Sequence, residues 1–137
     1  MKYFLDTNTC IYYLKGISAG IARRLLSLRP EDIRIPSMVK AELLYGVERS
    51  TKREENLQKI RQFLLPFEIV SFGNQEAERY AIVRAELDRA GTPIGPNDLV
   101  IAATTAENDG ILVTNNEKEF KRVSGLKIEN WMNDAAP

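Results

Sequence analysis

Several acidic or amide side chains stand where an α/β sheet would bring them together. Asp6 ends a short apolar run, YFL, and Asp98 follows the turn-rich stretch GTPIGPN. Glu42 lies one turn into a helix-like stretch, and Asn116 with Glu119 follows the apolar run ILVT. Open α/β sheets bind ligands outside the carboxyl ends of their strands. Crowded carboxylates raise each other's pKa unless a cation neutralises them, so a cluster of these residues predicts a Mg²⁺ or Mn²⁺ site.

A divalent ion at such a site lowers the pKa of a bound water and stabilises charge on a phosphate, as phosphodiester hydrolysis requires. The chain has no histidine and one cysteine, Cys10. Ser-His-Asp and Cys-His mechanisms are thereby excluded, as are histidine and thiolate zinc sites. An enzyme without an organic cofactor must then use carboxylates, lysines, hydroxyls or a hard metal ion. Cys10, placed among apolar residues near a helix start, is expected to be a small core residue.

Each of these residues also has an ordinary structural explanation. Asp6 fits the N-cap of the helix that follows it, and Asp98 fits a helix N-terminus through the helix dipole. Glu42 could face solvent, Thr114 could satisfy backbone groups at a strand end, and Glu119 could be solvated surface. The spacing alone therefore supports an acidic, metal-binding α/β domain and no finer function.

Strands alternate with helices along the chain. The strand-like runs are residues 2–6, 33–35, 67–70, 111–113 and 126–128. Helices are expected after the first strand, over 37–48, within TKREENLQKIRQFLLP, over 74–90 and over 97–108. This alternation predicts an α/β fold with a mostly parallel central sheet and helices on both faces.

Length and charge set further limits. The 137 residues, 44% of them hydrophobic, fit a single domain. Lys plus Arg and Asp plus Glu are both 19, so the net charge indicates neither a nucleic acid nor a membrane, although a local basic face remains compatible with it. No segment approaches the roughly 20 apolar residues needed to span a bilayer, and no leader pattern opens the chain. We therefore expect a soluble, cytoplasmic protein without a membrane partner.

Four longer segments carry a more specific signal. They are FLDTNTCIYYL, IPSMVKAELLYGV, GTPIGPNDLVIAATTAENDGILVTNNEKEF and VSGLKIENW. Together they resemble PIN-domain proteins, and in detail the VapC toxins of bacterial toxin-antitoxin pairs, from Lys2 to Trp131. The resemblance implies a single PIN domain over residues 1–137, a PIN-like three-layer α/β/α fold and a Mg²⁺- or Mn²⁺-dependent endoribonuclease.

Position by position, Asp6, Glu42 and Asp98 match the family's three principal acids, which implies catalytic and metal-binding roles for them. Many PIN domains have Asp two residues after the strand-end Thr, whereas this chain has Asn116 there. Glu119, just before a phenylalanine, is the nearest acid. Asn116 and Glu119 are therefore both candidates for the fourth metal position, and variants of each should change the metal requirement of the reaction.

The mechanism that the resemblance implies is in-line attack of a metal-activated water on an RNA phosphodiester, which leaves a 5′-phosphate and a 3′-hydroxyl. Glu42 would be a third metal ligand or the base that orients the water. Asn8 and Thr114 would support the geometry by hydrogen bonding. Similar members cut structured RNA, including transfer RNA, so a tRNA is the expected substrate.

The resemblance also implies partners, namely a cognate VapB-type antitoxin and a second copy of the chain in a homodimer. A helix of the antitoxin is expected in an apolar groove near Leu43-Leu44-Tyr45 and Leu57, Ile60 and Leu64. These residues could instead face the core.

Two other classes of function stay open at this point. FLDTNT is similar to the D-x-D-x-T start of aspartate-nucleophile phosphatases, although Asn8 stands where the second acid would donate a proton. The other alternative is a non-catalytic α/β module that binds RNA or a partner protein and retains an acidic pocket.

Overall fold

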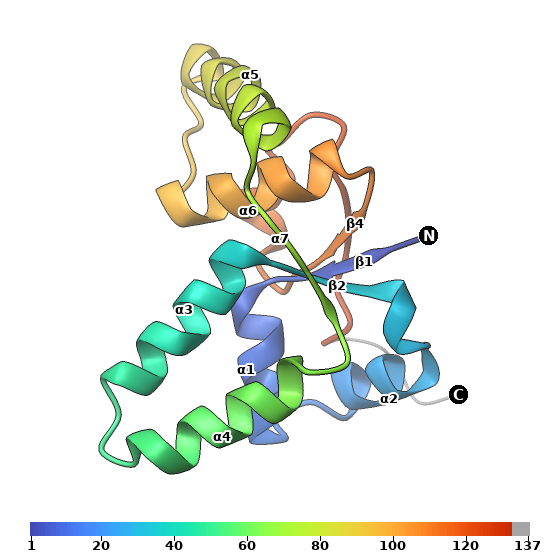
Figure 1. Cartoon of the computed structure of the whole chain (residues 1–137). Helices are drawn as coiled ribbons and strands as arrows, with labels where there is room; N and C mark the ends of the chain where they lie inside the picture. Colours follow the sequence, from blue (N-terminus) through green and yellow to red (C-terminus); the bar gives the residue numbers. More distant parts are fainter. Residues whose placement is uncertain (133–137) are drawn as a thin grey trace.

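A five-stranded parallel sheet forms the centre of the protein, as the computed structural model in Figure 1 shows. The structure describes residues 1–132. In chain order the strands are β1 (Tyr3–Leu5), β2 (Ile33–Pro36), β3 (Glu68–Val70), β4 (Ile111–Val113) and β5 (Lys127–Glu129). Their order across the sheet is β3-β2-β1-β4-β5, and every neighbouring pair is parallel. Because β1 lies between β2 and β4, the carboxyl end of β1 is where such sheets offer a binding crevice.

Helices cover both faces of this sheet within the described residues. They are α1 (Thr7–Lys15), α2 (Ala19–Ser27), α3 (Ser37–Glu48), α4 (Arg53–Leu64), α5 (Asn74–Ala90), α6 (Pro96–Glu107), α7 (Glu117–Phe120) and a 3-10 turn (Pro30–Asp32). Figure 1 shows α5 and α6 on one side of the sheet and α1, α2 and α4 on the other. α3 packs against α1, α4 and α6. The three-layer α/β/α prediction is confirmed.

Most element bounds agree with the predicted ones. The helices over 37–48 and 74–90 are confirmed residue for residue, and each strand bound differs from its predicted position by at most one residue. Gly91, at φ 71°, ends α5 in the left-handed conformation that favours glycine. α6 begins at Pro96 rather than Asn97, because proline fits the first turn of a helix.

The core lies around the central strands. Phe4 and Leu112, on adjacent strands, are almost fully buried, and Cys10 is buried in the same core as expected. A Cβ atom on Gly110 would lie 2.3 Å from the Phe4 ring. Only glycine therefore lets the chain approach β1 this closely before it enters β4.

Trp131 holds the end of the described chain against the sheet. Its indole is 1% exposed and lies 5.5 Å, centroid to centroid, from the Tyr3 ring. The Arg24 guanidinium stands 5.0 Å from the centre of the Trp131 ring, a cation–π geometry. Both Trp131 Nε1 and Arg24 donate to Glu129, at 2.9 and 3.2 Å. These contacts link β5 to α2.

Residues 1–132 share one sheet and one core, and residues 133–137 of the predicted domain lie outside the described residues. None of the helices in the described part of the chain is long and apolar enough to cross a membrane.

Candidate active site

Four carboxylates from different elements meet at the carboxyl edge of the sheet. Asp6 follows β1, Glu42 lies on α3, Asp98 lies in the first turn of α6 and Glu119 lies on α7. The charges of Glu119, Asp6 and Glu42 each raise the pKa of Asp98, so these three carboxylates lie close enough to Asp98 to act on it. The fold thus gathers acids that are scattered along the sequence.

Asp6 is buried, with 6% of its surface exposed. Its Oδ1 atom accepts a hydrogen bond from the backbone N–H of Thr9 at 2.9 Å, so Asp6 caps α1. Burial raises the pKa of Asp6, and the charge of Glu42 acts in the same direction, while hydrogen bonds from Thr114 and Thr9 oppose the shift. Asp6 is therefore a helix cap, as its position suggested. The capping role alone does not explain why Asp6 is buried and close enough to Glu42 to feel its charge.

Glu42 accepts a hydrogen bond on each of its carboxylate oxygens. Thr7 Oγ1 donates to Oε1 at 2.5 Å, and Asn97 Nδ2 donates to Oε2 at 3.2 Å. Thr7 directly follows Asp6, and Asn97 directly precedes Asp98. Glu42 therefore faces the other acids and is not an ordinary solvent-facing residue of α3.

Asp98 is the member of the cluster whose charge is least well compensated. Burial, followed by the charges of Glu119, Asp6 and Glu42, raises its pKa to about 6. Its position in the first turn of α6 has the opposite tendency, because a helix N-terminus favours negative charge. Within residues 1–132 no group donates a hydrogen bond to this carboxylate. A cation near Asp98 would relieve this crowding.

The crowding predicts a specific pH dependence of stability. The pKa of Asp98 is about 6 in the folded protein and 3.8 in the ordinary case, so the folded state holds the proton more tightly. The stability that this proton contributes is present below about pH 4 and is lost as the pH rises to about 6. We expect metal-free wild type to lose stability relative to Asp98→Asn over this range. Urea unfolding of both proteins in a chelator would measure the difference, and a gap that stays constant with pH would contradict it.

Glu119 is directed at the start of α6. Its Oε1 accepts from the backbone N–H of Gly95 at 2.8 Å, and its Oε2 accepts from Asn116 Nδ2 at 2.7 Å. These hydrogen bonds, the one from Gly95 first, lower the pKa of Glu119, and the charge of Arg122 adds to the effect. Asn116 precedes α7, but its side chain makes no capping hydrogen bond. The Asn116 side chain donates its hydrogen bond to Glu119 instead.

The expected supporting residues differ in their surroundings. Thr114 is fully buried, hydrogen bonds to Asp6 and accepts the backbone N–H two residues further on at 2.9 Å. Asn8 is exposed, and its side chain makes no hydrogen bond to the described part of the chain. Thr7 and Asn97, which the sequence did not single out, contact the cluster directly. Their only signal in the sequence is that each adjoins an acid.

The donors of this cluster are carboxylate, amide and hydroxyl oxygens, which hard divalent cations prefer. Among residues 1–132, no three Asp, Glu or Cys side chains lie close enough together to hold an ion as they stand. Mg²⁺ usually keeps several waters and takes only one or two carboxylates directly. The donor set therefore fits a hydrated Mg²⁺ or Mn²⁺, with Asp6 and Asp98 as candidate ligands.

Comparison with known proteins agrees with the fold. Residues 3–126 match the PIN domain family. The chain is 39% identical over 131 residues to the tRNA(fMet)-specific endonuclease VapC of Salmonella typhimurium, with 96% of this chain and 98% of that protein covered. It is 42% identical to ribonuclease VapC2 of Rickettsia felis, with the same coverage. The chain therefore belongs to the PIN-domain family and, within it, to the VapC group.

Solved structures give the same result. The crystal structure of DNA-bound VapBC from Salmonella typhimurium superposes with a TM-score of 0.90, at 39% identity and with 96% of this chain and 98% of that chain covered. VapBC2 from Rickettsia felis, bound to a DNA fragment from the promoter, superposes with a TM-score of 0.89 at 41% identity, with 96% and 99% covered. The resemblance that the four sequence segments indicated is confirmed. The phosphatase alternative has no support, because Asn8 cannot serve as the second acid and the family is a different one.

Proposed function

We propose that this protein is an endoribonuclease that cleaves tRNA with Mg²⁺ or Mn²⁺ and that a VapB-type antitoxin inhibits it. One observation carries the proposal. Three further carboxylates act on Asp98 in a chain that is 39% identical, along 96% of its length, to a tRNA(fMet)-specific endonuclease. Two of the similar solved structures are VapBC complexes, which supports the antitoxin as a partner.

A bound divalent ion would supply a water of lowered pKa and would neutralise charge on the phosphate. Asp6 and Asp98 would hold the ion through their carboxylate oxygens. Glu42 would orient the attacking water and accept its proton at a carboxylate oxygen, since its carboxylate faces the cluster. The water oxygen forms a bond to phosphorus as the bond from phosphorus to the 3′-oxygen breaks, and the leaving 3′-oxygen takes up a proton from the solvent. The fragments then carry a 5′-phosphate and a 3′-hydroxyl.

The purified protein tests this proposal on total RNA and on tRNA(fMet). We expect cleavage with Mg²⁺ or Mn²⁺, none in a chelator, and recovery when the metal is added back. Mapping of the fragment ends should find the 5′-phosphate. Binding of RNA without metal-dependent cleavage would instead favour the non-catalytic module.

The fourth metal position gives a separate prediction. A Gln at position 119 keeps one acceptor oxygen but presents an amide nitrogen to a donor, either Gly95 N–H or Asn116 Nδ2. It also removes a negative charge that acts on Asp98. We therefore expect Glu119→Gln to raise the Mg²⁺ concentration for half-maximal cleavage, and Asn116→Asp to lower it or leave it unchanged. A Glu119→Gln titration that overlays the wild type would limit the site to Asp6, Glu42 and Asp98.

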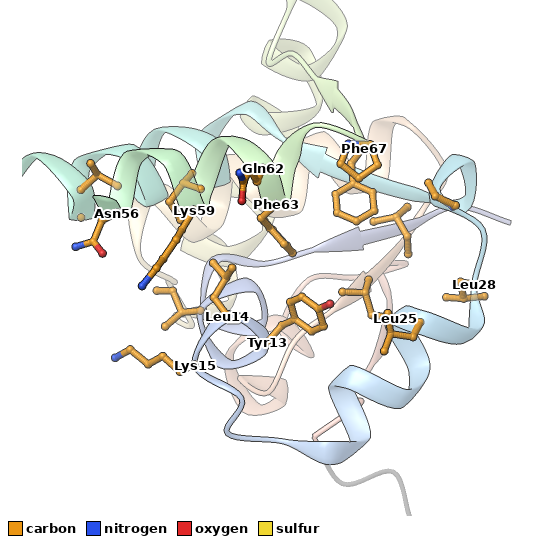
Figure 2. A pocket seen from close by; sticks show the side chains of 18 residues that line it. Tyr13, Leu14, Lys15, Leu25, Leu28, Asn56, Lys59, Gln62, Phe63 and Phe67 are labelled. Atoms are coloured by element: carbon orange, nitrogen blue, oxygen red, sulfur yellow. The ribbon is translucent and has the colours of Figure 1, made fainter. Parts of the chain in front are cut away.

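An apolar groove offers a place for the antitoxin. It has a volume of about 960 Å³ and lies between α1, α2 and α4. Figure 2 shows Tyr13 and Leu14 facing Phe63 across it, with Lys15 and Lys59 at one end. An amphipathic helix could bury its apolar face there and place acidic residues beside the two lysines. We propose that the antitoxin binds in this groove.

Homodimerisation, which the family resemblance implies, stays a prediction that light scattering can check.

The groove does not lie between α3 and α4, where the spacing of apolar residues in the sequence predicted it. Of the six residues expected to line it, only Ile60 does so; the other five are Leu43, Leu44, Tyr45, Leu57 and Leu64. Because α3 and α4 pack directly against each other, apolar side chains fill the space between these two helices. The open groove lies instead on the side of α4 that faces α1.

A further inference from the structure

Three residues connect the helices that carry the acids. Thr7 on α1 and Asn97 on α6 donate to the two carboxylate oxygens of Glu42 on α3. We call this group of three the Glu42 clamp. Each donor adjoins another acid of the cluster, so the clamp ties the position of Glu42 to those of Asp6 and Asp98.

The clamp restricts a side chain that would otherwise be mobile. A glutamate on a helix has three side-chain torsions and can adopt several rotamers. The hydrogen bond from Thr7 is short, at 2.5 Å, as hydrogen bonds from a hydroxyl to a carboxylate are. The bond from Asn97 comes from a different helix, at 3.2 Å. Two donors on two elements select one orientation of the carboxylate.

We propose that Thr7 and Asn97 are positioning residues that hold the Glu42 carboxylate toward Asp6 and Asp98 for RNA cleavage. The inference rests on the proposed function, in which Glu42 acts on the attacking water. In this role Thr7 and Asn97 act through the Glu42 carboxylate and take no direct part in the reaction. Their effect must therefore disappear when the Glu42 carboxylate is absent.

A double-mutant cycle tests this dependence. Thr7→Val keeps the shape of the side chain and removes the hydroxyl, whereas Thr7→Ser keeps the donor. We expect Thr7→Val to lower kcat by about 10- to 100-fold with little change in KM, as loss of an outer hydrogen-bond partner commonly does. Thr7→Ser should retain most of the activity. In the Glu42→Ala background, Thr7→Val should have little further effect.

Asn97→Ala is expected to follow the same pattern in the cycle. Thr51→Val is the matched control for Thr7→Val, because Thr51 is exposed in the turn between α3 and α4. A readout independent of activity is the crystal structure of the double variant Thr7→Val, Asn97→Ala, in which the Glu42 side chain should leave its present orientation.

Three outcomes would overturn the inference. Thr7→Val and Asn97→Ala could cleave RNA as wild type does, their losses could persist in full without the Glu42 carboxylate, or Glu42 could keep its orientation in the double variant. In each case the proposed function stands if wild type cleaves RNA. A wild type that does not cleave RNA would remove the proposed function and this inference with it.

Discussion

Replacing Asp6 by Asn is expected to reduce RNA cleavage by at least about 100-fold, which corresponds to about 2.7 kcal/mol of activation free energy. The substitution keeps the shape of the side chain and removes the charge that would hold the metal ion. Asn caps a helix as well as Asp does, so α1 should begin at the same residue. Because burial raises the pKa of Asp6, loss of its charge should not destabilise the fold. Cleavage rates and growth toxicity measure the effect.

The control for this experiment is Asp88→Asn, which makes the same chemical change at an exposed position on α5. It should cleave RNA and arrest growth as wild type does. Wild-type cleavage by a well-folded Asp6→Asn protein would remove Asp6 from the active site.

A charge in the apolar groove is expected to free the protein from its antitoxin. Leu14 and Leu26 line the groove and are 37% and 74% exposed, so Glu at either position is compatible with folding. In the complex the new carboxylate would be removed from water inside an apolar contact, which costs several kcal/mol. We expect antitoxin affinity to fall by at least about 30-fold, the factor that a 2 kcal/mol interface residue contributes. Calorimetric titration and cleavage assays with added antitoxin measure it.

Leu65→Glu is the control, because it adds the same charge to the surface outside the groove. Leu65 is 85% exposed and follows α4, but it does not line the groove. This variant should bind the antitoxin as wild type does. Equal antitoxin binding by Leu14→Glu, Leu26→Glu and wild type would place the antitoxin elsewhere on the surface.

The elements could be predicted because their signals are local. Gly91 and the proline at the start of α3 mark helix ends, and apolar runs mark the buried strands. α2 was not predicted, although Ser18 caps it and Ile21 and Leu25 are buried four residues apart. These two apolar residues stand among arginines, so their spacing is a weak signal in a helix of nine residues.

The candidate site could be predicted only as far as strand order determines it. Asp6 follows β1, and the helix that carries Asp98, α6, leads into β4, the strand beside β1. The contact of Glu119 with Gly95 joins residues 24 positions apart and depends on how α7 lies against α6. Thr7 and Asn97 depend on side-chain rotamers across three helices. The spacing of residues in the sequence predicts neither the packing of α7 against α6 nor these side-chain hydrogen bonds.

The packing of Trp131 gives the protein a fluorophore of its own. It is the sole tryptophan of the sequence, so its emission comes from one environment. In the folded protein the indole is shielded from water between Tyr3 and Arg24. Unfolding would expose it and move its emission to longer wavelength. The folding of any variant at the acids or in the groove can thus be followed optically, without an added label.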